Sequence, residues 1–213
     1  MKRKVKTKVK GFRTTDGAGV KLVRVLGNLT TKEFDPILML DSFDSINPDD
    51  YTAGFPMHPH RGIETISYVS RGKMVHRDSL GNEAGISDGE VQWMNSGSGI
   101  MHEEMVPAAE RLLGVQLWLN LPAKDKMSKP SYNSIKNEDI KEIEIEGGKI
   151  RLLAGKYGEH EGYKGDYLSM DYYDIHLNAD AEVTLTMEED DSVMVFTLLG
   201  DVYIDGEHIE EKT

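Results

Sequence analysis

The chain of 213 residues lacks cysteine altogether. Disulfides, thiolate zinc sites, iron–sulfur clusters and thiol nucleophiles are therefore excluded, and histidine, aspartate and glutamate remain as side chains for a metal site. Long apolar runs are also missing, since no stretch approaches the roughly 18 apolar residues of a membrane-spanning helix. The basic N-terminus is followed by Gly11–Thr15 instead of the apolar core of a signal peptide. We expect a soluble, cytoplasmic protein that does not bind membranes.

Basic residues are in the minority, 25 against 37 acidic ones, and the net charge is −12 at pH 7. The first 13 residues carry seven Lys and Arg and no acid, which leaves a net charge of −19 on the other 200. A body this acidic repels phosphate backbones, so direct nucleic-acid binding is not expected. Lysines alternate along Lys4–Lys10, which favours an edge strand guarded by lysines over a DNA-binding tail.

Helical periodicity is nearly absent, and short apolar segments alternate with turn residues along most of the chain. Their even spacing from Val20 to Leu121 predicts an all-β barrel or sandwich. A polar stretch, residues 122–140, is predicted to be a linker. The strand pattern resumes over residues 141–213, where Glu182–Met187 and Val193–Leu199 are among the expected strands. The sequence thus predicts two β-rich domains, 1–121 and 141–213.

Two short motifs concentrate the chemistry. His58 and His60 flank a proline, and His102 and Glu104 flank a glutamate. Residues i and i+2 of a strand leave the same face, so each motif offers two ligands on one face. If the two strands face each other, three imidazoles and one carboxylate converge. Such a set suits one divalent metal ion: Fe(II), Mn, Ni, Co or Zn.

The competing interpretation is that these are ordinary histidines of an acidic protein, and the repeated i, i+2 spacing beside turns disfavours it. The remaining four histidines are isolated and are not expected to be ligands. His76 alone lies close enough in sequence to be a candidate for supporting a ligand from behind.

Three segments, Gly54–Tyr68, Asp78–Asn82 and Gly89–Met105, resemble the N-terminal domain of the pirin family, a branch of the cupin superfamily of small β-barrels. The resemblance implies a bicupin fold with iron in the N-terminal barrel and no metal in the C-terminal one. The iron ligands that it implies are His58, His60, His102 and Glu104. Because Gly200–His208 is similar to the middle of a second cupin, we expect that barrel to be incomplete. Either the chain is a truncated form, or a second copy or another protein completes the open sheet edge.

Many cupins place the ligating glutamate four residues after the second histidine, where this chain has Glu64. Pirin-type sites use the later glutamate, and the i, i+2 pairing with His102 also favours Glu104. Glu64 would then support the site without binding the metal.

The resemblance implies two kinds of activity. Bacterial members resemble quercetin 2,3-dioxygenases, which open a flavonol ring with O₂ and release carbon monoxide. Animal members act as iron- and redox-dependent cofactors of transcription factors. We expect the enzyme, with Fe(II), O₂ and a small aromatic, flavonol-like substrate, and with Glu104 as base. The alternative is an iron-dependent regulatory protein that binds a transcription factor or enzyme partner without turnover. Apolar walls for a planar substrate are expected from Phe55, Met57, Trp93 and Met94.

Overall fold

The computed structural model describes residues 2–213, and strands dominate them. The chain divides into two compact units, the first from the N-terminus to Ser134 together with Phe196–Thr213, the second Ile135–Val195. The all-β prediction is confirmed. Within residues 2–213, helices are limited to three short turns, α1 (Thr31–Phe34), η1 (Pro48–Asp50) and η2 (Ala123–Asp125). None of the helices in residues 2–213 is long and apolar enough to cross a membrane.

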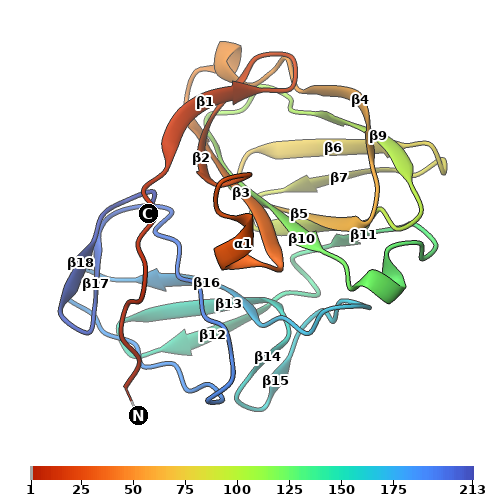
Figure 1. Ribbon diagram of the computed structural model, residues 1–213. Coiled ribbons are helices and arrows are strands. Elements are labelled where there is room, and N and C mark those ends of the chain that lie inside the picture. The colour runs from red at the N-terminus through yellow and green to blue at the C-terminus, as the bar shows by residue number, and fades with distance from the viewer. Residues whose placement is uncertain (1) are drawn as a thin grey trace. The chain divides into compact units, whose positions relative to one another are not determined.

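The larger sheet of the first unit has seven strands in the order β1-β2-β3-β10-β5-β8-β11, and Figure 1 labels all of them except β8. Its strands are β1 (Phe12–Asp16), β2 (Val20–Leu26), β3 (Ile37–Ser45), β10 (Leu112–Asn120), β5 (Ile63–Arg71), β8 (Glu90–Asn95) and β11 (Ser131–Ile135). The pairs from β1 to β8 are antiparallel. Both faces of β5, β8 and β10 are largely buried, and the buried residues include polar ones as well as apolar ones.

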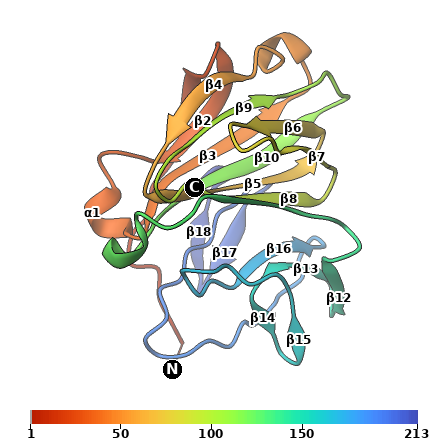
Figure 2. The same ribbon diagram turned by 90° about the vertical axis from the view of Figure 1, so that its right-hand side faces the viewer.

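A four-stranded sheet, in the order β4-β9-β6-β7, forms a second layer over β5, β8 and β10 (Figure 2). Its strands are β4 (Phe55–His60), β9 (Ile100–Met105), β6 (Lys73–Asp78) and β7 (Glu83–Ser87). Side chains join the two layers, since Gln92 of β8 and Gln116 of β10 both donate hydrogen bonds to Glu104 of β9. The space between the layers therefore contains both the core and the predicted metal ligands.

Along β6 and β5 the residues between the layers change from apolar to polar. Along β6 the residues on the inner face are Met74, then His76, then Asp78, all buried. Along β5 they are Val69, then Ser67, then Thr65, equally buried. The apolar end belongs to one cluster, formed by Val20, Leu22, Phe43, Tyr51, Phe55, Val69, Met74, Ile86, Val106 and Leu112. One end of the sandwich thus supplies hydrophobic stabilisation, and the other is free to carry chemistry.

The prediction of an edge strand in the lysine-rich arm is wrong. Residues 2–11 form no strand. Instead Lys8 forms an ion pair of 2.7 Å with Glu207, Lys10 forms one with Glu210, and Gly11 N–H donates to the Lys212 carbonyl. The alternating lysines meet acidic side chains of the C-terminal segment, which needs charge complementarity but no ladder of backbone hydrogen bonds.

The segment predicted to be a linker contains η2 and β11, and β11 extends the seven-stranded sheet beside β8. The C-terminal hairpin, β17 (Val202–Ile204) with β18 (Glu207–Ile209), belongs to the first compact unit. The division into domains at 1–121, 122–140 and 141–213 stays a prediction.

The second unit has a three-stranded antiparallel sheet of β12 (Lys141–Ile145), β13 (Gly148–Ala154) and β16 (Tyr172–Leu177). A short ribbon pairs β14 (Lys156–Tyr157) with β15 (His160–Glu161). The expected strands at Glu182–Met187 and Val193–Leu199 are not formed. Side chains 181–187 do alternate between half-buried and exposed, but a strand also requires a neighbour for its backbone N–H and C=O groups. The incomplete second barrel and its pairing with a partner stay predictions.

Gly114 fixes the register of β10 against β5, at the point where the pairing shifts between Leu113 and Gly114. A Cβ atom there would collide with the Tyr68 carbonyl oxygen, a backbone atom. We expect Gly114→Ala to lower the free energy of unfolding by about 2 kcal/mol, measured by urea titration of metal-free protein with tryptophan fluorescence. In Gly85→Ala the new Cβ meets its nearest neighbours at 3.5 Å, so this control should be nearly neutral. Equal effects of the two changes would contradict the prediction.

Candidate metal centre

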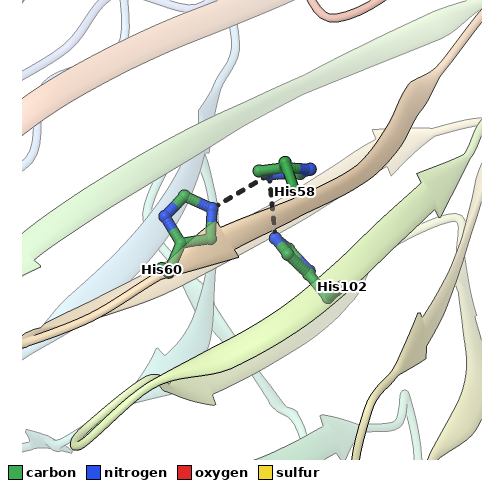
Figure 3. A group of neighbouring side chains, drawn as sticks. All are labelled: His58, His60 and His102. Atoms are coloured by element: carbon green, nitrogen blue, oxygen red, sulfur yellow. Dashed lines mark hydrogen bonds between the residues drawn. The ribbon is translucent and has the colours of Figure 1, made fainter.

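Three histidines meet on the inner face of the four-stranded sheet (Figure 3). His58 and His60 come from β4 and His102 from β9, and the register of the two strands sets His58 directly opposite His102. Pro59 stands between the first two. It is tolerated because β4 is an edge strand, where one missing backbone donor breaks little of the ladder. As the i, i+2 spacing predicts, both imidazoles of β4 point to the same side of the strand.

The ring nitrogens of this cluster lie at distances that suit a shared metal ion. His58 Nε2 lies 3.0 Å from His60 Nε2 and 3.1 Å from His102 Nε2, and all three ligand atoms lie within 4.8 Å of one another. Two nitrogens that are each about 2.1 Å from one ion, at a right angle to each other, are about 3.0 Å apart. The donor set therefore fits a divalent metal of the kind that imidazole binds.

The surroundings of the imidazoles suit metal binding. His58 Nδ1 lies 2.8 Å from the Pro56 carbonyl oxygen, an acceptor, so Nδ1–H donates there and Nε2 is the nitrogen left to face the cluster. Burial, with a smaller contribution from His58, lowers the pKa of His60 to about 4. Burial and the neighbouring histidines lower the pKa of His102 to about 2. Both rings are therefore neutral at neutral pH, the state in which imidazole binds a metal.

Glu104 lies on the same face of β9 as His102 and is 2% exposed. Its carboxylate accepts hydrogen bonds from Gln116 Nε2, at 3.1 and 3.2 Å, and from Gln92 Nε2. Both amides also donate to Ser67 Oγ, at 3.2 and 3.0 Å. Burial raises the pKa of Glu104, and the hydrogen bond from Gln116 opposes that rise. The cluster of ligand atoms within 4.8 Å consists of the three histidines alone, so Glu104 as fourth ligand stays a prediction.

Glu64 is equally buried, at 1% exposure, but faces the other way. The pairing of β5 with β8 is regular from Glu64 to Val69, so Glu64 and Ser67, three residues apart, leave opposite faces of the strand. Ser67 faces Gln92, Gln116 and the space between the layers. The structure therefore brings Glu104, and not Glu64, onto the inner surface that carries the histidines.

The four predicted wall residues do not gather in one place. Phe55 packs edge-on against Phe43 within the apolar cluster, with ring centroids 6.1 Å apart. Met57 is 46% exposed. Trp93 and Met94 are adjacent on β8 and so leave opposite faces, and Met94 shares the inner face with Gln92. Their role as pocket walls stays a prediction.

His76 lies against the cluster, with its ring centroid 5.2 Å from that of His102 and its side chain fully buried. The other three histidines, His160, His176 and His208, are exposed. The sequence alone missed Gln92, Gln116 and the Asp78 side chain that His76 contacts. A signal was available for the two glutamines, because each lies between large apolar residues in the sequence, Gln92 between Val91 and Trp93 and Gln116 between Val115 and Leu117.

Two facing antiparallel sheets with three clustered histidines between them define a cupin with a site that fits a metal ion. The sequence model of the family described as Pirin matches residues 19–119. The chain belongs to the pirin family.

Similar proteins cover most of the chain. A Pseudomonas aeruginosa protein named "Putative quercetin 2,3-dioxygenase" is 42% identical over 204 residues, which cover 92% of this chain and 72% of that protein. Human pirin is 33% identical over 214 residues, which cover 99% of this chain and 71% of pirin. A crystal structure of quercetin 2,3-dioxygenase from Acinetobacter baumannii is 30% identical and superposes with a TM-score of 0.87, covering 100% of this chain and 77% of that one.

The two buried glutamates allow a direct test of the fourth ligand. We expect Glu104→Gln to weaken binding of Co(II) at least tenfold, because the variant removes a charge from the face that carries the histidines. Glu64→Gln is the matched control, since it makes the same change on the opposite face and should leave affinity nearly unchanged. Competition with a chromophoric chelator measures both, and equal losses would show that the choice between the glutamates is wrong.

Proposed function

We propose that this chain is a metal-dependent dioxygenase of the quercetin 2,3-dioxygenase type, which cleaves a flavonol with O₂ at a mononuclear Fe(II) site. The observation that carries the proposal is the convergence of three imidazoles between the two sheets. The names of the P. aeruginosa relative and of the A. baumannii structure support it.

The residues that would hold the metal are His58, His60, His102 and Glu104. When bound, the metal would supply a Lewis acid that lowers the pKa of a coordinated substrate hydroxyl and a centre that reacts with O₂. Mn, Ni, Co and Zn share the preference for these donors, and metal analysis of the purified protein decides among them.

Glu104 is suited to accept the proton of the substrate hydroxyl at its carboxylate. Burial raises the pKa of Glu104 toward neutral pH, and a general base works best when its pKa lies near the working pH. Gln92 and Gln116 hold the carboxylate from behind, so that proton uptake occurs at an oriented group. The two amides keep their own positions through Ser67.

Two further polar atoms support an oxygen-bearing aromatic substrate. Thr65 and Trp118 are direct neighbours across β5 and β10, on the inner face, and the Trp118 ring stands edge-on to His60 at 4.9 Å. Thr65 Oγ1 and Trp118 Nε1 are buried, and within residues 2–213 neither has a hydrogen-bond partner. A buried donor without a partner costs roughly 1–3 kcal/mol. We propose that substrate oxygens accept these hydrogen bonds, while the indole packs against the flavonol ring.

Oxygen uptake tests the proposed activity. Protein loaded anaerobically with Fe(II) and given quercetin and air should consume O₂, bleach the flavonol absorption band and release carbon monoxide. His102→Ala should lose this activity at least a hundredfold, because it removes a metal donor. His176→Ala, at an exposed histidine of the second unit, should keep it. Stoichiometric iron without O₂ uptake would reject the enzyme and favour the iron-dependent regulatory protein.

The substrate contacts predict a specific kinetic change. Thr65→Val keeps the side-chain shape and removes the hydroxyl, so we expect KM for quercetin to rise about tenfold with little change in kcat, which corresponds to about 1.4 kcal/mol. Ser42→Ala is the control. Ser42 Oγ is also buried without a partner in the described chain, but Ser42 pairs with Val115 and so faces away from Gln116. An unchanged KM in Thr65→Val would remove Thr65 from the substrate site.

A further inference from the structure

A buried pair of residues lies directly behind His102. Strand β6 pairs with β9 so that Asp78 is opposite His102 and His76 is opposite Glu104. His76 is 0% and Asp78 6% exposed. A buried acid beside a buried histidine is rare unless the two are hydrogen-bonded to each other. The pair therefore has a definite hydrogen-bonding role.

Two consecutive hydrogen bonds connect the pair to the histidine cluster. His102 Nδ1 lies 3.2 Å from His76 Nδ1, and His76 Nε2 lies 2.9 Å from Asp78 Oδ2. Burial opposes the charge on Asp78, but hydrogen bonds from His76 and Asn82 outweigh it and hold the pKa of Asp78 below its ordinary value. An ionised carboxylate only accepts, so His76 donates through Nε2–H. In a neutral His76, Nδ1 then carries the lone pair, and His102 must donate through its own Nδ1–H.

We propose that Asp78 and His76 are positioning residues that hold His102 in the Nδ1–H tautomer, with its Nε2 lone pair directed at His58. Residues behind metal-bound histidines commonly fix the tautomer in this way, through a carboxylate or carbonyl oxygen that accepts the other ring N–H. Here the carboxylate acts through an intervening imidazole, so that two residues of β6 orient a histidine of β9. The inference rests on the proposed metal site and is independent of the reaction proposed for it.

Both members of the pair are held in place. The His76 ring stacks on Tyr132, with centroids 4.0 Å apart and planes 12° from parallel. Asp78 Oδ1 accepts from the backbone N–H groups of Leu80, at 2.9 Å, and Asn82, at 3.1 Å. Asp78 Oδ2 accepts from Asn82 Nδ2 at 2.8 Å as well as from His76. Each oxygen of the carboxylate thus receives two donors, which leaves it one orientation.

This arrangement makes Asp78→Asn a sharp probe. The backbone N–H groups of Leu80 and Asn82 both need an acceptor, so the single oxygen of the new amide must face them. The new NH₂ group then faces His76 Nε2. His76 must then accept at Nε2 and carry its proton on Nδ1. The Nδ1–H groups of His76 and His102 would then face each other as two donors without an acceptor between them. His102 relieves the conflict by moving its proton to Nε2, and that nitrogen can then no longer bind a metal.

Imidazole nitrogen NMR on the metal-free, ¹⁵N-histidine-labelled full chain tests the proposal without any metal or turnover. In the wild type we expect His102 with Nδ1 protonated and Nε2 bare, and His76 with the opposite pattern. Asp78→Asn should reverse both patterns. A wild-type His102 protonated at Nε2, or a His76 protonated at both nitrogens at pH 7.5, would overturn the relay even if the variant failed to fold.

Affinity for Co(II), measured by chelator competition, gives a second readout. Asp78→Asn should weaken binding at least tenfold, and His76→Phe, which keeps an aromatic ring against Tyr132, should weaken it similarly. Asp174→Asn is the matched control. Asp174 accepts from His176 Nε2 at 2.7 Å with the same i, i+2 spacing, in an exposed pair, and should leave affinity unchanged. Folded variants at positions 76 and 78 that bind Co(II) like the wild type would overturn the proposal. A chain that shows the relay but no O₂ uptake would refute the dioxygenase alone.

Discussion

The convergence of three imidazole rings between two sheets is the constraint on which the first unit depends. Their ring nitrogens lie about 3 Å apart, and burial removes most of the water that would otherwise solvate them. Burial also lowers the pKa of His60 and His102, so these two rings stay neutral at neutral pH. The cluster is held from outside, by the Pro56 carbonyl behind His58 and by His76 behind His102. A metal ion would hold the three rings together by shared coordination.

The register of the strands determines whether these side chains meet between the sheets. A slip of one residue in β9 would turn His102 and Glu104 outward and bring Met101 and Glu103 inward, so the pairing of β9 with both β4 and β6 must be unique. The apolar cluster at the other end of the sandwich supplies the burial that fixes the register, because Met74 on β6 and Phe55 on β4 belong to it. Stability and chemistry thus occupy successive residues of the same strands, and each depends on the same alignment.

Local pattern predicted those parts of the molecule that depend on one strand at a time. The i, i+2 motifs gave the inward direction of His58, His60 and His102 correctly, because side-chain alternation is a property of a single strand. The hydrogen bonds of Gln92 and Gln116 with Glu104 could not be read in this way, since they cross between sheets. Failures have the same origin. Residues 182–187 alternate as a strand would, yet they lack a neighbouring strand to pair with, and pairing is not encoded in the alternation.

Two buried polar atoms beside His60 bear on the choice between the proposed dioxygenase and the alternative, an iron-dependent regulatory protein. A protein that only binds iron and reports its redox state needs the three histidines, Glu104 and the residues behind them, and all of these are satisfied by one another or by the metal. It has no use for a buried hydroxyl and a buried indole N–H without partners in the described chain, side by side next to His60. Such atoms reduce stability unless a ligand with acceptor oxygens arrives. Such atoms beside the histidine cluster suit an oxygen-bearing substrate, and this is the physical reason for which we propose the enzyme before the regulator.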